Sequence, residues 1–358
     1  MIIRLMVVKD GRSVNKKMKR KAFKVVILYI VLCMVSGCGS INESNESNTS
    51  EVNDMESGQL SGTIPTELEY IPENYETPAK QQGTINKLTY ETWESFSYED
   101  HSQPLEKNAW VYLPYGYSND QKYNIFYLSH GGWSNETTIT GTAQNPSSFK
   151  NVVDHAIEDG KMQPMILVFP TYNNTSENDS SDYSLALQLT DQFHNELVND
   201  LIPAVESQYS TYATETTPEG LKASRDHRGF GGFSMGSVNT WCTLRYYLDY
   251  FRYFMPMSGS YTSDGDYMAD LVSNQGYGPE DFFIFAASGT DDFAYNSFKN
   301  QINAMTDGSN DIFRLATSKA DGNVVFLHEK AIVMMLLQVM NILIMVYVFS
   351  GIDKLLFN

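Results

Sequence analysis

The stretch GFGGFSMGSV, residues 229–238, decides the fold, because it contains a Gly-x-Ser-x-Gly pentapeptide centred on Ser234. An apolar run precedes the pentapeptide and a helix-compatible run follows it. This pattern is typical of a serine on a sharp strand-to-helix turn, where its hydroxyl is exposed for nucleophilic attack. Because the pentapeptide also occurs by chance, it predicts a catalytic serine only together with this context. Such a serine further needs a histidine base and an acid.

The segments around this turn alternate between strand and helix patterns. Half-buried antiparallel strands are predicted where apolar and polar residues alternate, at 87–93 and 108–114. Short continuous apolar runs at 124–132 and 165–170 are typical of strands buried on both faces. Apolar residues recur at helical spacing in other segments, chiefly 149–160 and 187–209. The alternation predicts one α/β domain with a central, mostly parallel sheet and helices on both faces.

The composition excludes several classes of function. The 358 residues carry a formal net charge of −18, which disfavours nucleic acid as a partner and suits a protein that works outside the cell or on neutral carbohydrate. The three cysteines are Cys33, Cys38 and Cys242, and only Cys242 lies in the globular part. Neither a disulfide framework nor a set of paired zinc ligands follows from them, so no metal site is expected.

The first 37 residues have the pattern of a targeting segment. A basic cluster follows Met18, which we interpret as the true start, and the apolar run 25–35 comes next. The sequence VSGC at 35–38 resembles the lipobox of bacterial lipoproteins, which predicts lipidation at Cys38 and a membrane anchor at the cell surface. The alternative is an uncleaved anchor helix. Residues 38–82, rich in Asn, Ser and Glu at their start, are predicted to be a flexible polar linker.

The sequence SHGGW, residues 129–133, follows a predicted buried strand. Its glycines allow the backbone to approach a substrate closely. We therefore expect N–H groups of Gly132 and Trp133 to bind the oxyanion of a tetrahedral intermediate, together with the N–H of Met235. His130 is expected to shape this turn rather than to act as the base.

The sequence SGTDD, residues 288–292, supplies the candidate acid. It follows a predicted strand downstream of Ser234, where the chain order Ser, Asp, His requires a carboxylate. The pattern does not choose between Asp291 and Asp292, and either one is also compatible with an ordinary solvated turn.

Four motifs together give a resemblance over residues 70–327. They are YLPYGY (112–117), SHGGW (129–133), HRGFGGFSMG (227–236) and FAASGTDDFAY (285–295). In this order they resemble the feruloyl esterase and acetyl xylan esterase group of the esterase D-like α/β-hydrolases. The resemblance implies an α/β-hydrolase fold, Ser234 as nucleophile, Asp292 as acid and no cofactor. It implies plant cell-wall xylan bearing feruloyl or acetyl esters as substrate and partner. The family usually has a second glycine where this chain has Ser237.

The histidine of this family is missing from its expected place. The family's base lies in a Gly-His or Thr-His motif shortly after the last strand, followed by a helix that ends in aromatic residues. Here the strand predicted at 323–327 leads directly into His328, the only histidine beyond Asp292. His328 is therefore the tentative base, and an incidental strand-end residue is the alternative. The following stretch, 331–350, is apolar enough to be a membrane helix.

The genetic code offers another origin for this tail. The codons of KAIVMM, residues 330–335, can encode Gly-His-Ser-Tyr-Asp when they are translated with a two-base offset. The codons further along can likewise encode an aromatic-rich ending similar to that of the family. We therefore interpret residues 83–330 as the esterase domain and 331–358 as a tail produced by a frameshift.

These observations predict a serine carboxylesterase that acts on feruloyl or acetyl esters of xylan. One alternative is a catalytically impaired, carbohydrate-binding surface lipoprotein, which the printed ending favours. Another is an esterase or acyltransferase for a different acyl ester, such as S-formylglutathione or a mycolyl ester. Trp133 and Tyr172 are candidates for stacking on a feruloyl ring or a sugar, and equally for core or rim positions.

The frameshift interpretation is tested by sequencing the gene across codons 325 to 335 from the source DNA. We expect a frame that encodes Gly-His, because this single change restores the missing base. An independent determination that returns the printed frame would contradict a sequencing error and leave a chain without the family's histidine.

Overall fold

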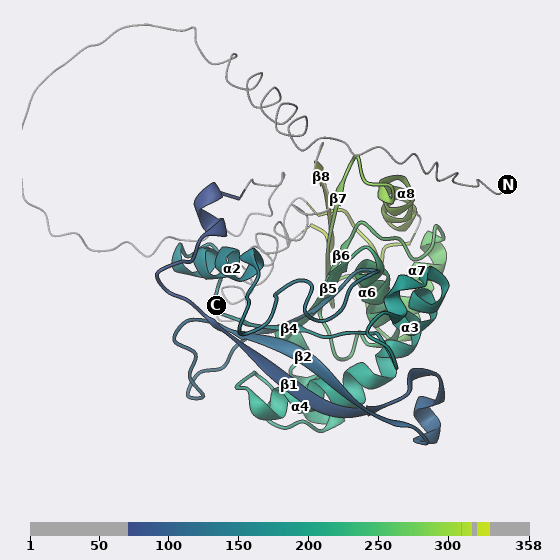
Figure 1. Cartoon of the computed structure of the whole chain (residues 1–358). Helices are drawn as coiled ribbons and strands as arrows, with labels where there is room; N and C mark the ends of the chain where they lie inside the picture. Colours follow the sequence, from purple (N-terminus) through teal and green to yellow (C-terminus); the bar gives the residue numbers. More distant parts are fainter. Residues whose placement is uncertain (1–70, 309, 317–320, 330–358) are drawn as a thin grey trace, which may run out of the picture. The chain divides into compact units, whose positions relative to one another are not determined.

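A computed structural model describes residues 71–308, 310–316 and 321–329 (Figure 1). The predicted signal region, the lipidation site at Cys38 and the apolar tail 331–358 lie outside these residues. The predicted linker, 38–82, is described only from residue 71 onward.

The described strands form one eight-stranded sheet, in the order β1-β2-β4-β3-β5-β6-β7-β8. The pairs β1–β2 and β2–β4 are antiparallel, and all the other pairs are parallel. This confirms the predicted mostly parallel sheet and the two antiparallel strands before it. The strands are β1 Thr84–Trp93, β2 Pro104–Leu113, β3 Ile125–Ser129, β4 Ile166–Phe169, β5 Arg228–Phe233, β6 Tyr253–Met257, β7 Phe283–Gly289 and β8 Val324–Glu329.

Helices cover both faces of this sheet, as Figure 1 shows. Most of the described helices pack with one apolar cluster on one face, whereas α2 packs with a second cluster on the other. The α-helices are α2 Ser148–Glu158, α3 Tyr183–Glu196, α4 Ile202–Gln208, α5 Pro218–Ala223, α6 Met235–Tyr246, α7 Gly265–Asn274 and α8 Tyr295–Thr306. The short turns are η2 Glu73–Glu76, η3 Ser95–Asp100, η4 Asp179–Ser181, η5 Leu197–Leu201 (a π-helix) and η6 Arg225–His227.

The side chains of strand β3 are divided between the apolar clusters on the two faces of the sheet. Its five residues are all buried, which explains the continuous apolar run. Ile125 and Tyr127 belong to the cluster under α3 and α6, whereas Phe126 and Leu128 belong to the cluster under α2. Because successive side chains of a strand point to opposite faces, one short segment contributes to both cores.

The segment predicted as a single helix at 187–209 is divided in the structure. Helix α3 starts earlier, at Tyr183, and the π-helix η5 separates it from α4. Pro203, in the first turn of α4, has no N–H to donate to the preceding turn. The wider π-helical turn lies directly before this point, where the regular ladder of helix hydrogen bonds is interrupted.

Residues 71–82, expected to belong to the linker, pack against α2. The Tyr75 side chain is buried, and its hydroxyl donates to the Asp159 carboxylate. The backbone N–H of Gly83 donates to the buried Asp154 carboxylate at 2.8 Å. This part of the polar stretch therefore belongs to the folded domain, which begins at least twelve residues before the predicted boundary at residue 83.

Arg228, the first residue of β5, is fixed by a buried ion pair. Its Nε and one terminal nitrogen donate to the two Glu206 carboxylate oxygens at 2.6 and 2.9 Å. Its remaining donors reach the carbonyls of Leu221 and Tyr250 and the hydroxyl of Ser224, each at 2.8 Å. All five guanidinium N–H groups thus have a partner, as a buried charge requires. This network anchors the strand that ends at Ser234.

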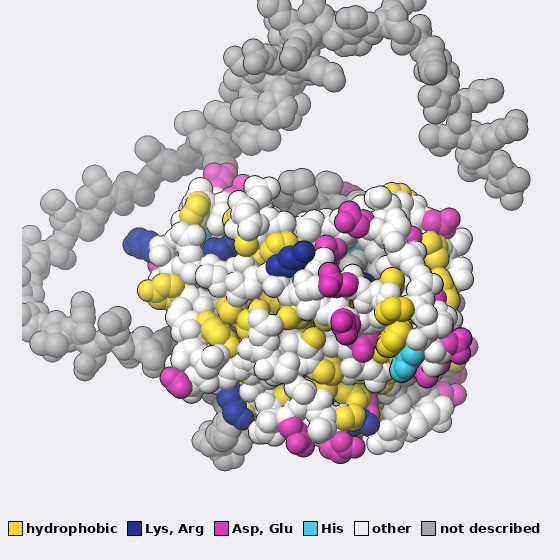
Figure 2. Space-filling view, turned by 60° about the horizontal axis from the view of Figure 1, so that its bottom comes forward, with side chains coloured by type: hydrophobic (Ala, Val, Ile, Leu, Met, Phe, Trp, Pro, Cys, Tyr) yellow, Lys and Arg dark blue, Asp and Glu magenta, His cyan; other side chains and the backbone are white. Residues whose placement is uncertain are grey.

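The surface carries its charge in a dispersed way. On the face shown in Figure 2, Lys and Arg side chains lie apart from one another among many acidic ones, so this face has no continuous basic stripe. Within the described ranges, no helix is both long and apolar enough to cross a membrane.

Candidate active site

Ser234 lies between β5 and α6 in a strained backbone conformation. Its φ and ψ angles are 57° and −114°, in a region that residues other than glycine rarely adopt. Its N–H donates to the Met257 carbonyl at 2.9 Å, so the sheet ladder extends to the turn itself. Helix α6 begins at the next residue, which directs the positive end of its dipole toward the hydroxyl. This is the geometry of a nucleophile elbow.

The two glycines of the pentapeptide are required by close backbone contacts. A Cβ on Gly236 would lie 2.3 Å from the Ser129 carbonyl oxygen, and one on Gly232 would lie 2.6 Å from the Gly236 backbone. Neither distance is compatible with a side chain. Ser237 does not disturb the turn, because its buried hydroxyl donates to the Gly259 carbonyl at 2.7 Å. The departure from the family's second glycine is thereby accommodated.

His130 is buried in the loop beside the elbow. Its Nδ1 lies 2.7 Å from the Gly131 carbonyl oxygen, and its Nε2 lies 2.7 Å from the Thr171 hydroxyl. Since a carbonyl only accepts, Nδ1 carries the proton and Nε2 accepts from Thr171. Burial lowers the pKa of His130 to about 4. Both nitrogens are occupied away from Ser234, in agreement with a role in shaping the turn.

The candidate oxyanion donors differ in their availability. Met235 is the first residue of α6, where a backbone N–H has no partner within the helix. In the loop, the Trp133 N–H donates to the Ser180 carbonyl at 3.0 Å and is therefore occupied. Gly132 makes no such hydrogen bond to the described residues and remains as the second donor. The assignment of the Trp133 N–H to the oxyanion is therefore not supported by this geometry.

The two aromatic residues considered for stacking have different environments. The Trp133 side chain is 72% exposed, on a backbone with φ of 56°. Tyr172 is buried, stacks on the His130 ring at 4.4 Å between centroids and donates its hydroxyl to the Gly131 carbonyl at 2.8 Å. Tyr172 therefore supports the loop, whereas the ring of Trp133 is exposed on the surface.

Asp292 lies in the turn after β7, at the same edge of the sheet as Ser234. Its carboxylate accepts a hydrogen bond from the Ala294 N–H at 2.9 Å, and the residue is half-buried. Asp291 is exposed. Strand β6 lies between β5 and β7, so the backbones of these two strands are about 10 Å apart. An imidazole must therefore bridge the carboxylate and the serine.

His328 is far from this place. It pairs with Ser288 across β7–β8, so it lies level with Ser234 along the strands but three strands away, at about 14 Å. This separation exceeds the combined reach of a serine and a histidine side chain. The imidazole is exposed and contacts the rings of Tyr295 and Phe326. Its tentative assignment as the base is therefore not supported, because a strand-end residue on β8 cannot reach the elbow.

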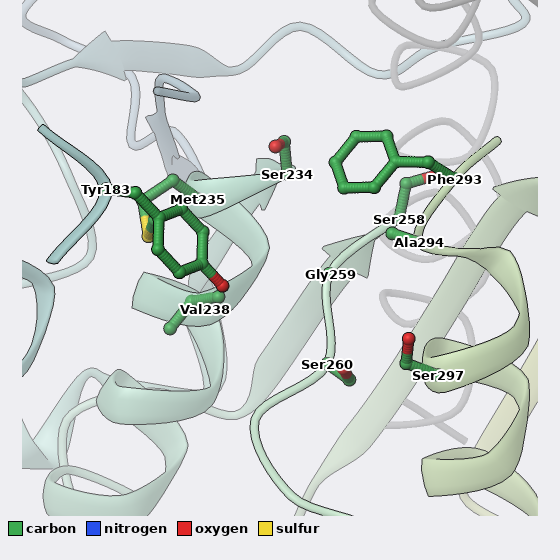
Figure 3. A pocket seen from close by; sticks show the side chains of 10 residues that line it. All are labelled: Tyr183, Ser234, Met235, Val238, Ser258, Gly259, Ser260, Phe293, Ala294 and Ser297. Atoms are coloured by element: carbon green, nitrogen blue, oxygen red, sulfur yellow. The ribbon is translucent and has the colours of Figure 1, made fainter. Parts of the chain in front are cut away.

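The Ser234 hydroxyl opens into a pocket of about 130 Å³. Figure 3 shows the rings of Tyr183 and Phe293 on two sides of it, with Ser234 between them. Both rings are accessible, with Tyr183 60% and Phe293 83% exposed. The other lining residues are Met235, Val238, Ser258, Gly259, Ser260, Ala294 and Ser297.

The described residues offer little for a metal ion. Within 71–308, 310–316 and 321–329, no group of three or more His, Cys, Asp or Glu side chains is arranged to bind one. Cys242 is a free thiol on α6, where burial raises its pKa to about 12, so it is not a candidate nucleophile.

Fold and elbow together define an α/β-hydrolase. Residues 103–311 match the Esterase family model. The chain therefore belongs to the Esterase family. The predicted fold and the predicted resemblance to feruloyl esterases are both confirmed by the proteins to which the chain is similar.

Two curated relatives are larger proteins. The chain is 42% identical over 243 residues to endo-1,4-beta-xylanase Y of Acetivibrio thermocellus, which covers 65% of this chain and 20% of that protein. It is 29% identical over 217 residues to an endo-1,4-beta-xylanase/feruloyl esterase of Xylanibacter ruminicola, which covers 56% of this chain and 26% of the relative. The chain thus spans about a quarter or less of their length.

Among solved structures, the feruloyl esterase module from Clostridium thermocellum, an S954A mutant in complex with sinapinate, is 36% identical to this chain. The alignment covers 83% of this chain and 98% of the module, with a TM-score of 0.70. A ferulic acid esterase from Anaeromyces mucronatus, 17% identical with a TM-score of 0.52 over 80% of this chain and 97% of that one, shares the fold.

The sequence did not reveal the residues that form the pocket walls. Tyr183 is preceded by the polar loop 173–182, and Phe293 follows the aspartate pair directly. The sequence signal that could have identified Phe293 is an aromatic residue within a polar turn. Lys107, Thr171 and Ser180, which support the loop at 129–133, lie in other segments and left no signal.

The burial of His130 predicts a pH dependence of stability. Its pKa is about 4 in the folded chain, against an ordinary 6.5, so the unfolded chain binds more protons between these values. Stability therefore falls as the pH is lowered from 6.5 to 4. Between pH 7 and pH 4 we expect the free energy of unfolding to fall by about 3 kcal/mol more in the natural chain than in His130→Asn. The asparagine keeps a donor for the Gly131 carbonyl but does not titrate. Urea unfolding of both proteins measures this, and parallel curves would contradict it.

Proposed function

We propose that this protein hydrolyses feruloyl-type esters of plant cell-wall xylan by serine catalysis. The observation that carries the proposal is the Ser234 pocket, in which an elbow serine faces two accessible aromatic rings, Tyr183 and Phe293. Aromatic walls add stacking energy for a hydroxycinnamoyl ring and give none to an acetyl group. The relatives named as feruloyl esterases, and the sinapinate complex of one of them, support the same substrate class.

We assign the following chemistry to the site, which the position of Ser234 at the elbow supports. The Ser234 oxygen attacks the ester carbonyl, a histidine takes the hydroxyl proton, and the carbonyl oxygen becomes an oxyanion. The N–H groups of Met235 and Gly132 stabilise this charge. As the intermediate collapses, the ester C–O bond breaks and the histidine returns its proton to the leaving oxygen, which departs as the alcohol; water then releases the acid from the acyl-enzyme by the same steps. Asp292 orients the histidine and stabilises its charged form.

The base is assigned to a histidine that the printed frame lacks. Ser234 makes no side-chain hydrogen bond to any described histidine, and neither His130 nor His328 can serve. A Gly-His pair encoded just beyond β8 would lie in a loop that starts two strands away from β6. This loop would start at the edge of the sheet where Ser234 and Asp292 lie on either side of β6. We therefore propose that the active protein carries the alternative ending.

A second candidate is a carbohydrate-binding surface lipoprotein without catalysis. The observation that favours it is the same lack of a positioned base among the described residues. For either function we propose an extracellular location, with the domain tethered at the cell surface by a lipid on Cys38. The sequence pattern VSGC at 35–38 supports this location.

The nucleophile is tested by Ser234→Ala with methyl ferulate as substrate, in the printed chain and in the chain with the Gly-His ending. We expect the restored chain to be active, and Ser234→Ala to lower its kcat by at least about 10³-fold, because the covalent step is lost. Fluorophosphonate labelling of the printed chain is expected to be weak, since its serine has no base.

Ser260→Ala is the matched control, because this serine lines the same pocket without lying at the elbow. It is expected to retain activity within about threefold. Equal losses in Ser234→Ala and Ser260→Ala would contradict the assignment. Equal activity of the printed and restored chains would contradict the need for a second histidine.

The preference for an aromatic acyl group is tested by Phe293→Ala. Losing one stacking wall is expected to lower kcat/KM for methyl ferulate about 10-fold and to leave hydrolysis of acetylated xylo-oligosaccharides nearly unchanged. Tyr115→Ala is the control, since Tyr115 is 56% exposed and does not line the pocket. A similar loss for both substrates would argue against an aromatic subsite.

A further inference from the structure

Lys107 is a buried charge on β2, beneath the loop at 129–133. The residue is 6% exposed, and its Nζ pairs with the Glu196 carboxylate at 2.7 Å. Glu196 is 3% exposed and also accepts from the Tyr90 hydroxyl. Because both charges are removed from water, the pair contributes little to stability compared with apolar residues of the same size. The role of the pair therefore depends on the groups that Lys107 and Glu196 contact.

The position of Glu196 is itself unusual. It is the last residue of α3 and immediately precedes the π-helix η5. Short π-helical turns are rare and occur frequently near functional sites. The irregular turn begins at the carboxylate that pairs with Lys107, so the helix geometry changes where the ion pair forms.

The next contact leads from Lys107 to Thr171. Nζ donates to the Thr171 carbonyl at 2.8 Å. The Thr171 hydroxyl accepts from the Asn173 N–H at 3.0 Å, so its own hydrogen is free to point to the His130 Nε2 at 2.7 Å. The direction of each hydrogen bond is thus determined, from the lysine to the imidazole.

His130 in turn orients the peptide group between Gly131 and Gly132. Its Nδ1–H donates to the Gly131 carbonyl, which also accepts from the Tyr172 hydroxyl. Two buried donors therefore fix the direction of the Gly131 carbonyl. Because the peptide group is planar and trans, the N–H of Gly132 points the opposite way.

The loop that contains this peptide lies against the elbow. A Cβ built on Gly131 would lie 3.6 Å from the Ser234 Cβ and 3.3 Å from the Phe233 carbonyl oxygen. Gly131 thus lies against the elbow, and the peptide that joins it to Gly132 starts there. Its N–H is one of the two donors that the proposed mechanism requires.

We propose that Lys107 is a positioning residue, which acts through Thr171 and His130 to aim the Gly132 N–H at the oxyanion formed on Ser234. The inference rests on the proposed esterase function for its catalytic consequence. The chain of hydrogen bonds itself does not depend on that function.

Two variants break the chain at different links. Lys107→Met removes the ammonium donor, and Thr171→Val removes the hydroxyl that reaches His130. Thr171→Ser retains the hydroxyl and serves as the conservative rescue. Lys150→Met is the matched control, because Lys150 forms another buried pair, with Asp154, on the distant helix α2.

The first measurement uses the printed full-length chain and needs no activity. With ¹⁵N-labelled histidine, NMR reports which His130 nitrogen is protonated and how fast its proton exchanges with water. We expect a protected Nδ1–H in the natural chain, Thr171→Ser and Lys150→Met, and at least about 10-fold faster exchange in Thr171→Val and Lys107→Met. Unchanged exchange in both of these variants would overturn the proposal.

The second measurement is kinetic and uses whichever form of the chain hydrolyses methyl ferulate. Lys107→Met and Thr171→Val are expected to lower kcat about 10- to 100-fold with KM within about twofold, because a misdirected oxyanion donor acts on the transition state. Thr171→Ser and Lys150→Met are expected to retain kcat. Faster exchange without a loss of kcat would overturn the positioning role. A parent without activity would contradict the proposed function, and the NMR result would still decide whether the hydrogen-bond chain exists.

Discussion

The rest of the site depends on a close crossing of two backbone segments at the carboxyl end of the sheet. The loop after β3 passes the elbow after β5 so tightly that the Ser129 carbonyl would lie 2.3 Å from a Cβ on Gly236. This contact excludes any side chain at position 236, and the neighbouring Ser234 has a positive φ. Both strands are parallel neighbours in the sheet, so the crossing follows from their register, in which Ser129 lies opposite Gly232. The ladder itself thereby brings Ser234 and the loop that carries Gly132 together.

Side chains then determine which way the peptides at this crossing face. The Gly131 carbonyl is fixed by His130 and Tyr172, and on the other side of Ser234 the Gly259 carbonyl is fixed by Ser237 and Trp241. Each carbonyl has two donors from buried side chains. A strained turn persists only where its surroundings determine it from several directions. These four donors, together with the Arg228 network at the start of β5, provide that determination.

The same geometry explains why one histidine cannot replace another. His130 is close to the elbow but buried, and both of its nitrogens are occupied. The His328 imidazole makes no hydrogen bond to the described residues, but it lies three strands away from Ser234. A base for Ser234 must combine proximity with a free nitrogen, and neither of these two histidines does.

The sequence by itself determined the sheet and the elbow, and it placed the candidate acid in the turn after β7. Periodicity distinguishes the antiparallel strands β1 and β2 from the fully buried β3 and β4, and the spacing of glycines around Ser234 marks the turn, because these are properties of neighbouring residues. The tertiary structure alone showed that Asp292 is half-buried whereas Asp291 is exposed, paired the Trp133 N–H with the Ser180 carbonyl, and placed His328 three strands away from Ser234. It also united Lys107, Thr171 and His130, which lie 23 or more residues apart in sequence. Such contacts depend on the order and register of the strands, and no local pattern of residues encodes the distance between one strand end and another.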